Sequence, residues 1–270
     1  PVHSMFAYQG AGVAERSPFL LLDYAPPYSF APHSGPRRGV GQHPHRGFET
    51  VTIVYSGELE HRDSTGAGGL IGAGDVQWMT AGGGIVHEEF HAPAFSQTGG
   101  VFHVAQLWVN LPAKDKMTPA HYQGITAAQI PSLALPQGAG QLRLIAGDWE
   151  DKKAPAQTYT PMRVWDLRLA AGGRADLPQP EGWNTLLLVQ SGSVQINDGA
   201  TVQSMQTATL SAAGTGLTLA NTGSVEAQLL LLSGEPIDEP VCGYGPFVMN
   251  SREEIKQAID DFNSGRFGQH

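Results

Sequence analysis

The chain is poor in cysteine and in basic residues, and each shortage excludes a class of protein. Cys242 is the only cysteine among 270 residues, so no internal disulfide can form and a reducing compartment is expected. Sixteen Lys and Arg residues stand against 25 Asp and Glu residues, and the net charge is −9. Since nucleic-acid binding relies on clustered cations, we expect no direct nucleic-acid partner.

Long apolar stretches are also missing. No run approaches the roughly 20 apolar residues that a membrane span requires. The first ten residues, PVHSMFAYQG, lack the charged and apolar regions of a signal peptide. We therefore expect a cytoplasmic protein without a membrane role, and no pattern in the chain points to an obligate oligomer, which favours a monomer.

What is abundant is glycine and proline, in an otherwise globular composition. The chain has 34 Gly and 19 Pro residues without a fixed period, with 41% hydrophobic and 15% charged residues. Short β-rich runs separated by turn residues are typical of a sandwich or barrel. The expected strands cover residues 50–55, 76–79, 106–109, 164–169, 185–189, 193–196, 217–220 and 227–232.

One helix is expected, at about residues 251–263. Ser251 and Glu254 have the spacing of a capping box, in which each side chain accepts from an unpaired backbone N–H. Ile255, Ile259 and Phe262 form an apolar stripe that can pack on the rest of the protein.

The chain also contains an internal repeat. Residues 43–57 align with residues 178–192 at a constant offset of 135, and the alignment pairs Gly47 with Gly182 and Gly57 with Gly192. Two copies of one β-domain are therefore predicted, an N-terminal domain over residues 1–130 and a C-terminal domain over 131–270 that ends in the helix. The Pro-, Gly- and charge-rich residues 130–160 are predicted to contain the linker.

The repeat is asymmetric at its histidines. His43 and His45 of the first copy align with Pro178 and Pro180 of the second, and proline cannot ligate a metal. A site that uses these histidines is therefore expected in the N-terminal copy alone.

Two pairs of potential metal ligands share a spacing of two residues. Because side chains alternate faces along a strand, His43 and His45 point the same way, and so do His87 and Glu89. Three imidazoles and a carboxylate suit a first-row divalent ion, and four protein ligands leave two octahedral positions open for a substrate or O₂. Glu49 is a rival ligand of the same parity as His43.

The remaining histidines have plainer interpretations. His91 and His103 are weaker rivals as ligands, and His103 is a candidate to line a pocket. Five others are expected to be surface or hydrogen-bonded polar residues: His3, His33, His61, His121 and His270.

Several long motifs resemble those of the pirin family. They are HPHRGFETVT (43–52), HRDSTG (61–66), GAGDVQWMTAGGGIVHEE (72–89), QLWVNLPAKDKM (106–117) and GPFVMNSREEIKQAI (245–259). The resemblance is densest at residues 39–117. It implies two cupin β-barrels with one metal site in the N-terminal barrel. Gly83 departs from the pattern, because many pirins carry arginine at that position.

The resemblance also implies a ligand set and a chemistry. The ligands would be His43, His45, His87 and Glu89, with Glu49 beside them. The ion would be one divalent metal, Fe(II) by resemblance, while Mn, Ni, Cu, Co and Zn remain compatible.

The family is similar to quercetin 2,3-dioxygenases, which implies cleavage of flavonols with O₂ and a proton-accepting carboxylate, Glu89 or Glu49. The alternatives are a metal-dependent regulator that binds a transcription or metabolic partner protein, and a cupin module with no redox role. Candidates for the substrate pocket are mostly large apolar residues that could equally be core: Phe48, Trp78, Met79, Phe102 and, as the polar exception, His103.

Overall fold

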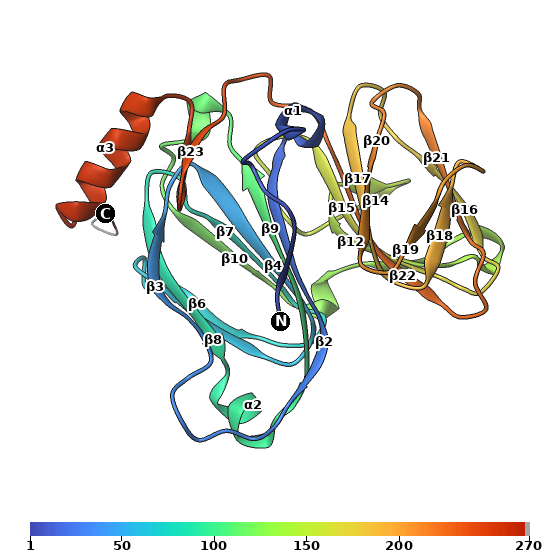
Figure 1. Ribbon diagram of the computed structural model, residues 1–270, viewed down its shortest axis with the longest axis horizontal. Coiled ribbons are helices and arrows are strands. Elements are labelled where there is room, and N and C mark those ends of the chain that lie inside the picture. Colours follow the sequence, from blue (N-terminus) through green and yellow to red (C-terminus); the bar gives the residue numbers. More distant parts are fainter. Residues whose placement is uncertain (268–270) are drawn as a thin grey trace. The chain divides into compact units, whose positions relative to one another are not determined.

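The computed structural model describes residues 1–267, which divide into two compact units built mainly from β-strands (Figure 1). Unit 1 contains residues 1–11, 19–127 and 237–267, and unit 2 contains residues 12–18 and 128–236. The predicted division at residue 130 lies close to the passage from unit 1 to unit 2. No pattern in the sequence indicated that the chain re-enters unit 1 at Ile237.

Unit 1 has two main sheets. The larger runs in the order β1 (His3–Phe6), β2 (Phe19–Phe30), β9 (Gly100–Asn110), β4 (Phe48–Ser56), β7 (Val76–Thr80), β10 (His121–Ile125). The smaller runs in the order β3 (Gly39–His45), β8 (Ile85–His91), β5 (Leu59–Asp63), β6 (Gly68–Ile71). Strands β3, β6 and β8 lie on one side of unit 1, and β2, β4 and β9 lie on the other (Figure 1).

Shorter elements complete unit 1. They are helix α2 (Pro93–Thr98), the 3₁₀ turn η1 (Ala113–Asp115), the hairpin of β23 (Cys242–Tyr244) and β24 (Phe247–Met249), and helix α3 (Arg252–Asn263). The turn η2 (Ala127–Gln129) stands where the chain passes from unit 1 to unit 2.

Unit 2 repeats the plan. Its larger sheet runs in the order β11 (Ser132–Ala134), β12 (Gly140–Ala146), β15 (Met162–Leu169), β22 (Ala227–Gly234), β17 (Asn184–Ser191), β20 (Gln206–Leu210). Its smaller sheet runs in the order β16 (Arg174–Pro178), β21 (Gly216–Asn221), β18 (Ser193–Ile196), β19 (Thr201–Gln203). The pair β13 (Asp148–Trp149) and β14 (Lys152–Lys153), helix α1 (Val13–Arg16) and turn η3 (Pro136–Gly138) complete it.

The linker prediction was wrong. Residues 130–160 hold strands β11 to β14, and β12 pairs with β15 inside the larger sheet of unit 2. The Pro and Gly residues of this stretch mark tight turns between short strands, a role that composition cannot separate from that of a linker.

The repeat is visible in the strand order. Strand β4 lies between β9 and β7, and the aligned strand β17 lies between β22 and β20. Gly47 and Gly182, which precede these strands, have φ angles of 91° and 84°, a region that glycine enters without strain. The two units are therefore two versions of one β-domain.

Helix α3 begins as predicted, with one difference in its cap. Ser251 Oγ accepts a hydrogen bond from the Glu254 N–H at 3.2 Å. The Glu254 carboxylate accepts from the N–H of Asn250 at 2.9 Å, one residue before the position that a capping box predicts.

The buried face of α3 also differs from the predicted stripe. Ile255 and Ala258 are buried, whereas Phe262 is 37% exposed. The helix packs against Phe247 and Met249 of β24, within unit 1. Its place in the sequence, after the second β-domain, therefore does not decide which unit it belongs to.

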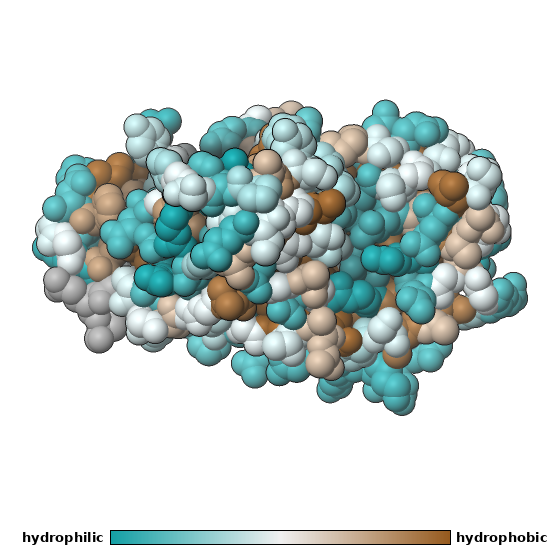
Figure 2. Space-filling view, turned by 90° about the horizontal axis from the view of Figure 1, so that it is seen from below, coloured by the Kyte–Doolittle hydropathy of each residue, from teal (hydrophilic) through white to brown (hydrophobic). Residues whose placement is uncertain are grey.

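On the face shown in Figure 2, hydrophobic residues are scattered among hydrophilic ones. None of the helices within residues 1–267 is long and apolar enough to cross a membrane.

Candidate metal centre

Neighbouring strands bring the predicted ligands of unit 1 together. Strands β3 and β8 are antiparallel, and His43 stands directly opposite His87. Burial alternates along β8, so that His87, Glu89 and His91 are buried while Glu88, between two of them, is only half-buried. The spacing of two therefore places each pair on one face, as the sequence indicated.

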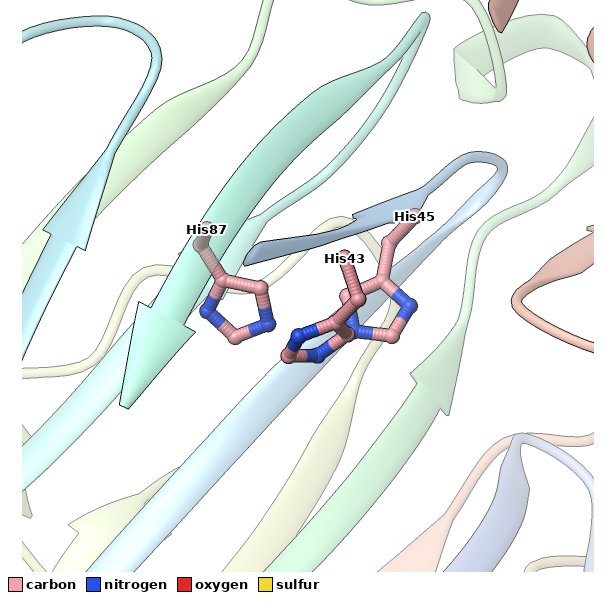
Figure 3. Close-up of side chains that lie close together, drawn as sticks. All are labelled: His43, His45 and His87. Atoms are coloured by element: carbon pink, nitrogen blue, oxygen red, sulfur yellow. The ribbon is translucent and has the colours of Figure 1, made fainter. Parts of the chain in front are cut away.

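The three histidines form a compact group. The ring centroids of His43 and His87 lie 4.3 Å apart, those of His43 and His45 4.8 Å apart, and those of His45 and His87 4.9 Å apart. All three potential ligand nitrogens lie within 4.8 Å of one another. In Figure 3 the rings point toward one another, with His43 and His45 from β3 and His87 from β8.

The ring nitrogens fit a metal ion. His43 Nδ1 lies 2.8 Å from the carbonyl oxygen of Gly41 and donates to it, which leaves the Nε2 lone pair of the neutral ring free. His87 Nε2 is buried without a hydrogen-bond partner in the described chain, and in Figure 3 this nitrogen faces the rings of His43 and His45. An unpaired buried polar atom is unfavourable, and a cation supplies the missing partner. The group therefore suits one first-row divalent ion.

His45 and His87 are also held in the form that binds metal. Burial is the main cause that lowers the pKa of His87 to about 2, followed by the charges of His43 and His61. Burial likewise lowers the pKa of His45 well below its usual value, followed by the charges of His87 and His43. Neutral imidazoles present lone pairs to a metal ion.

Glu89 is held beside this group by three donors. Its Oε1 accepts from Thr52 Oγ1 at 3.2 Å and from Gln77 Nε2 at 3.1 Å, and its Oε2 accepts from Gln106 Nε2 at 2.9 Å. Glu89 belongs to a second group of potential ligands, with His61 and His87, which shares His87 with the first.

The rival carboxylate, Glu49, is fully buried and belongs to neither group of potential ligands among the described residues. Its Oε1 accepts from Thr80 Oγ1 at 2.7 Å. Burial raises the pKa of Glu49 to about 7, while the hydrogen bond from Thr80 and the nearby indole of Trp78 act in the opposite direction.

A cavity of about 670 Å³ opens onto the site. His43, His45, Glu89 and Gln106 line it on the polar side. The wall is largely apolar and includes Tyr28, Phe30, His91, Phe102 and Trp108. This volume falls in the range of about 300–1,000 Å³ that is usual for small-molecule sites.

Of the pocket residues predicted from the sequence, one lines the cavity and the others are buried in the protein interior. Phe102 lines the cavity. Phe48, Trp78 and Met79 have no exposed surface and are not among the lining residues, which corresponds to the core interpretation. His103 is buried and lies 2.8 Å from the hydroxyl of Tyr24, also outside the cavity wall.

Sequence reasoning missed His61 and Asp63 as buried neighbours of the site. Their side chains have no exposed surface, and His61 Nε2 lies 2.9 Å from Asp63 Oδ2. The sequence predicted that His61 is either a surface residue or a hydrogen-bonded polar residue. The structure confirms the second alternative, because the His61 side chain is buried and hydrogen-bonded. His61 and Asp63 on β5 are two residues apart, as His43 and His45 are, and this spacing could have indicated that both side chains lie on the face of the site. His270 lies outside the described residues.

The residues after His45 are fixed by the C-terminal part of unit 1. The Arg46 N–H donates to the Pro246 carbonyl at 3.3 Å, and the Val248 N–H donates to the Arg46 carbonyl at 3.1 Å. A Cβ at Gly47 would stand 2.0 Å from the Val248 oxygen, so only glycine permits this approach.

Two buried cations strengthen this contact. Arg46 Nη1 lies 2.9 Å from Asp261 Oδ2 of helix α3, and Arg46 Nε donates to the Gly83 carbonyl at 2.7 Å. Lys116 Nζ donates to the Gly47 carbonyl, Asn110 Oδ1 and the Val248 carbonyl at 2.7–2.9 Å. Gly83, the departure noted in the sequence, thus contributes its backbone oxygen.

Comparison with protein families now decides the relationship. Residues 2–109 match the Pirin family model, and residues 164–268 match the Pirin C-terminal cupin domain. A protein of Pseudomonas aeruginosa provisionally named quercetin 2,3-dioxygenase is 55% identical over 267 residues, which is 99% of this chain and 92% of the relative. The chain belongs to the pirin family. Its two β-domains are cupin domains.

Other pirin relatives show how widely the likeness extends. A pirin-like protein of Solanum lycopersicum is 40% identical over 253 residues, which is 93% of this chain and 82% of that protein. The crystal structure of quercetin 2,3-dioxygenase from Acinetobacter baumannii matches with a TM-score of 0.94 and 51% identity, over 99% of this chain and 92% of that one. These relatives thus carry two names, quercetin 2,3-dioxygenase and pirin-like protein.

Proposed function

We propose that this pirin is a metal-dependent dioxygenase that cleaves flavonols such as quercetin with O₂. The observation that carries the proposal is the three-histidine group, with the unpaired buried Nε2 of His87, beside a largely apolar cavity of about 670 Å³ that His43 and His45 line. The name quercetin 2,3-dioxygenase, carried by relatives at 55% and 51% identity, supports the substrate class.

The proposed ligands are His43, His45, His87 and Glu89. Three nitrogens and one carboxylate oxygen suit Fe(II), our choice, and also Mn, Ni, Cu, Co and Zn. Glu89 accepts three hydrogen bonds, while a carboxylate has about four lone-pair sites. The remaining site is available to a cation or a proton.

The protein's own groups prepare the substrate. A bound ion supplies a Lewis acid that favours loss of a flavonol hydroxyl proton. Glu89 lines the cavity, so it can accept that proton when its one free lone pair leaves the ion, whereas Glu49 does not line the cavity. Thr52 and Gln106, which also line the cavity, fix the Glu89 carboxylate through their hydrogen bonds.

The cavity wall supports a flat aromatic ligand. The rings of Phe30, His91 and Phe102 contact one another, with centroids 4.5–6.1 Å apart. Such a wall excludes water and offers ring faces and edges to a polycyclic substrate.

The proposal is tested by elemental analysis and oxygen uptake. Wild-type protein prepared anaerobically with Fe(II) should hold about one iron, and His45→Ala and Glu89→Ala should lose most of it while remaining folded. His121→Ala, which removes an exposed histidine of the same unit, is the matched control and should retain the metal.

Oxygen uptake with flavonols then separates the two parts of the proposal. Uptake that follows the iron content supports the enzyme. A wild type that binds iron and consumes no O₂ with any flavonol rejects the dioxygenase and leaves a metal-binding regulatory role. A wild type without metal, or zinc that persists in Glu89→Ala, rejects the ligand set.

A further inference from the structure

We propose that Asp63 and His61 form a hydrogen-bond relay that fixes the tautomer of His87 and thereby presents its Nε2 lone pair to the metal site. This inference rests on the metal-binding part of the proposed function. It assigns a positioning role to two residues outside the four proposed ligands.

Strand pairing builds the relay. Strand β5 lies beside β8, with Asp63 opposite His87 and His61 opposite Glu89. His61 Nε2 lies 2.9 Å from Asp63 Oδ2, and His61 Nδ1 lies 3.4 Å from His87 Nδ1. The ring of Tyr122 stacks on that of His61, with centroids 5.0 Å apart, which fixes the plane of the imidazole.

The chemistry of each group sets the direction of the protons. A carboxylate only accepts hydrogen bonds, so His61 Nε2 carries the proton that is shared with Asp63. In the neutral ring, His61 Nδ1 is then an acceptor, and the facing His87 Nδ1 must carry a proton to donate to it. The His87 Nε2 lone pair remains free.

An independent observation agrees with this assignment. His87 Nε2 is the ring nitrogen of His87 that is buried without a hydrogen-bond partner in the described chain. The same ring belongs to the His43–His45–His87 group. The atom that the relay deprotonates is therefore the atom that lacks a partner.

His61 could itself be considered a ligand, since it forms a group with His87 and Glu89. However, both of its ring nitrogens face partners within the protein, Asp63 and His87. His61 thus has no nitrogen left over, in contrast to His45 and His87. Support of a ligand by a carboxylate through a hydrogen bond is a recurring arrangement at metal sites.

The surroundings of Asp63 provide a sharp test. Asp63 Oδ1 accepts from the backbone N–H of Thr65 at 2.8 Å and from Thr65 Oγ1 at 2.6 Å. In Asp63→Asn the amide oxygen must keep this position, so the amide NH₂ group faces His61 Nε2. The relay then reverses, His61 Nδ1 carries the proton, and His87 is driven to the Nε2–H tautomer, which cannot bind metal through Nε2.

The experiment uses the metal-free protein and Ni(II) as the probe. ¹⁵N NMR at about pH 8, where free imidazoles are neutral, should show His87 as the Nδ1–H tautomer in the wild type and as the Nε2–H tautomer in Asp63→Asn. Titration with Ni(II) should show roughly 10- to 100-fold weaker binding in the variant.

Two further variants keep the test decisive. Asp75→Asn is the matched control, because the Asp75 carboxylate in unit 1 likewise accepts backbone hydrogen bonds, from Gly72 and Ala127, and the variant should bind Ni(II) as the wild type does. If Asp63→Asn fails to fold, His61→Phe preserves a ring against Tyr122, removes the acceptor for His87, and should weaken Ni(II) binding to a similar degree.

Opposite results would overturn the relay. These are wild-type Ni(II) affinity in both variants, or a wild type whose His87 is protonated at Nε2. A wild type that binds no Ni(II) or Fe(II) would instead reject the proposed metal site, and the His87 tautomer would still decide the relay.

Discussion

The two cupin domains share a strand order, yet one row of neighbouring residues across the larger sheet is polar in unit 1 and apolar in unit 2. In unit 1 the strand register aligns four polar residues across β2, β9, β4 and β7: Asp23, Gln106, Thr52 and Gln77. In unit 2 the register aligns four apolar residues across β15, β22, β17 and β20: Trp165, Leu231, Leu187 and Ala208. Three of the polar residues hold Glu89, whereas the apolar row belongs to the core of unit 2.

This contrast separates what the fold fixes from what the residues fix. One backbone arrangement supports a polar candidate metal centre in one domain and a packed apolar core in the other. The chemistry therefore depends on one row of the sheet and on the facing strands β3 and β8, and the fold by itself does not determine it.

The largest expected effect concerns Lys116, the one lysine buried within the described residues. Lys116→Met removes the donor to three buried oxygen atoms, one of them the Gly47 carbonyl just after strand β3. Unit 1 should therefore lose about 3–5 kcal/mol of stability. Urea unfolding of the variant and of Lys114→Met, an exposed neighbour, measures this. Equal midpoints for the two variants would contradict the role given to Lys116.

The lowered pKa of Lys116 also predicts that the stability of the protein depends on pH. Burial lowers the pKa of Lys116 from 10.5 to about 7, so above pH 7 the unfolded chain binds more protons than the folded one. Stability contributed by this group therefore rises between about pH 7 and pH 10.5, by roughly 2–3 kcal/mol from pH 7 to pH 9. The rise should be absent from Lys116→Met, and a parallel pH profile in the two proteins would disprove it.

A swap into unit 2 should be the next largest effect. Leu231→Gln places the residue type of Gln106 into the apolar row, where Leu187 has no polar side-chain atom and Trp165 offers only a donor, so the amide NH₂ group finds no acceptor in the row. Loss of apolar burial and an unpaired amide should lower stability by about 2–4 kcal/mol. Leu231→Met, which keeps the volume, is the control and should lose less than about 1.5 kcal/mol.

The reverse swap should affect binding more than stability. Gln106→Leu removes the donor to Glu89 Oε2, and we expect roughly 10-fold or greater weakening of Ni(II) binding, with about 1 kcal/mol or less of stability lost. The exposed Gln141→Leu in unit 2 is the control, and isothermal titration makes the measurement. Unchanged affinity in Gln106→Leu would show that the polar row does not position Glu89.

The smallest effect tests the assignment of α3 to unit 1. Ser251→Ala removes the cap on the Glu254 N–H and should lower local stability by about 1 kcal/mol. Hydrogen exchange should accelerate in α3 and β24, with unit 2 unchanged and with Ser251→Thr close to the wild type. Faster exchange in unit 2 would contradict the assignment.

Much of this architecture could be predicted from local pattern. The alternation of faces placed His43 with His45 and His87 with Glu89, and the spacing of Ser251 and Glu254 marked the start of α3. These features depend on neighbours a few residues apart, which the sequence displays directly.

Features that depend on distant pairing could not be predicted. His61 reaches His87 only because β5 pairs with β8, and Arg46 meets Asp261 only because the chain returns to unit 1. Phe48, Trp78 and Phe102 look alike as apolar residues, and only the packed structure separates the cavity wall from the core.

The return of the chain to unit 1 has a consequence for biosynthesis. A ribosome translates residues 128–236, which form most of unit 2, before it reaches Pro246 and Val248. The backbone of Arg46 and Gly47, adjacent to His45, therefore lacks these partners until residues 128–236 have been made. The N-terminal cupin, although synthesised first, is the domain that is completed last.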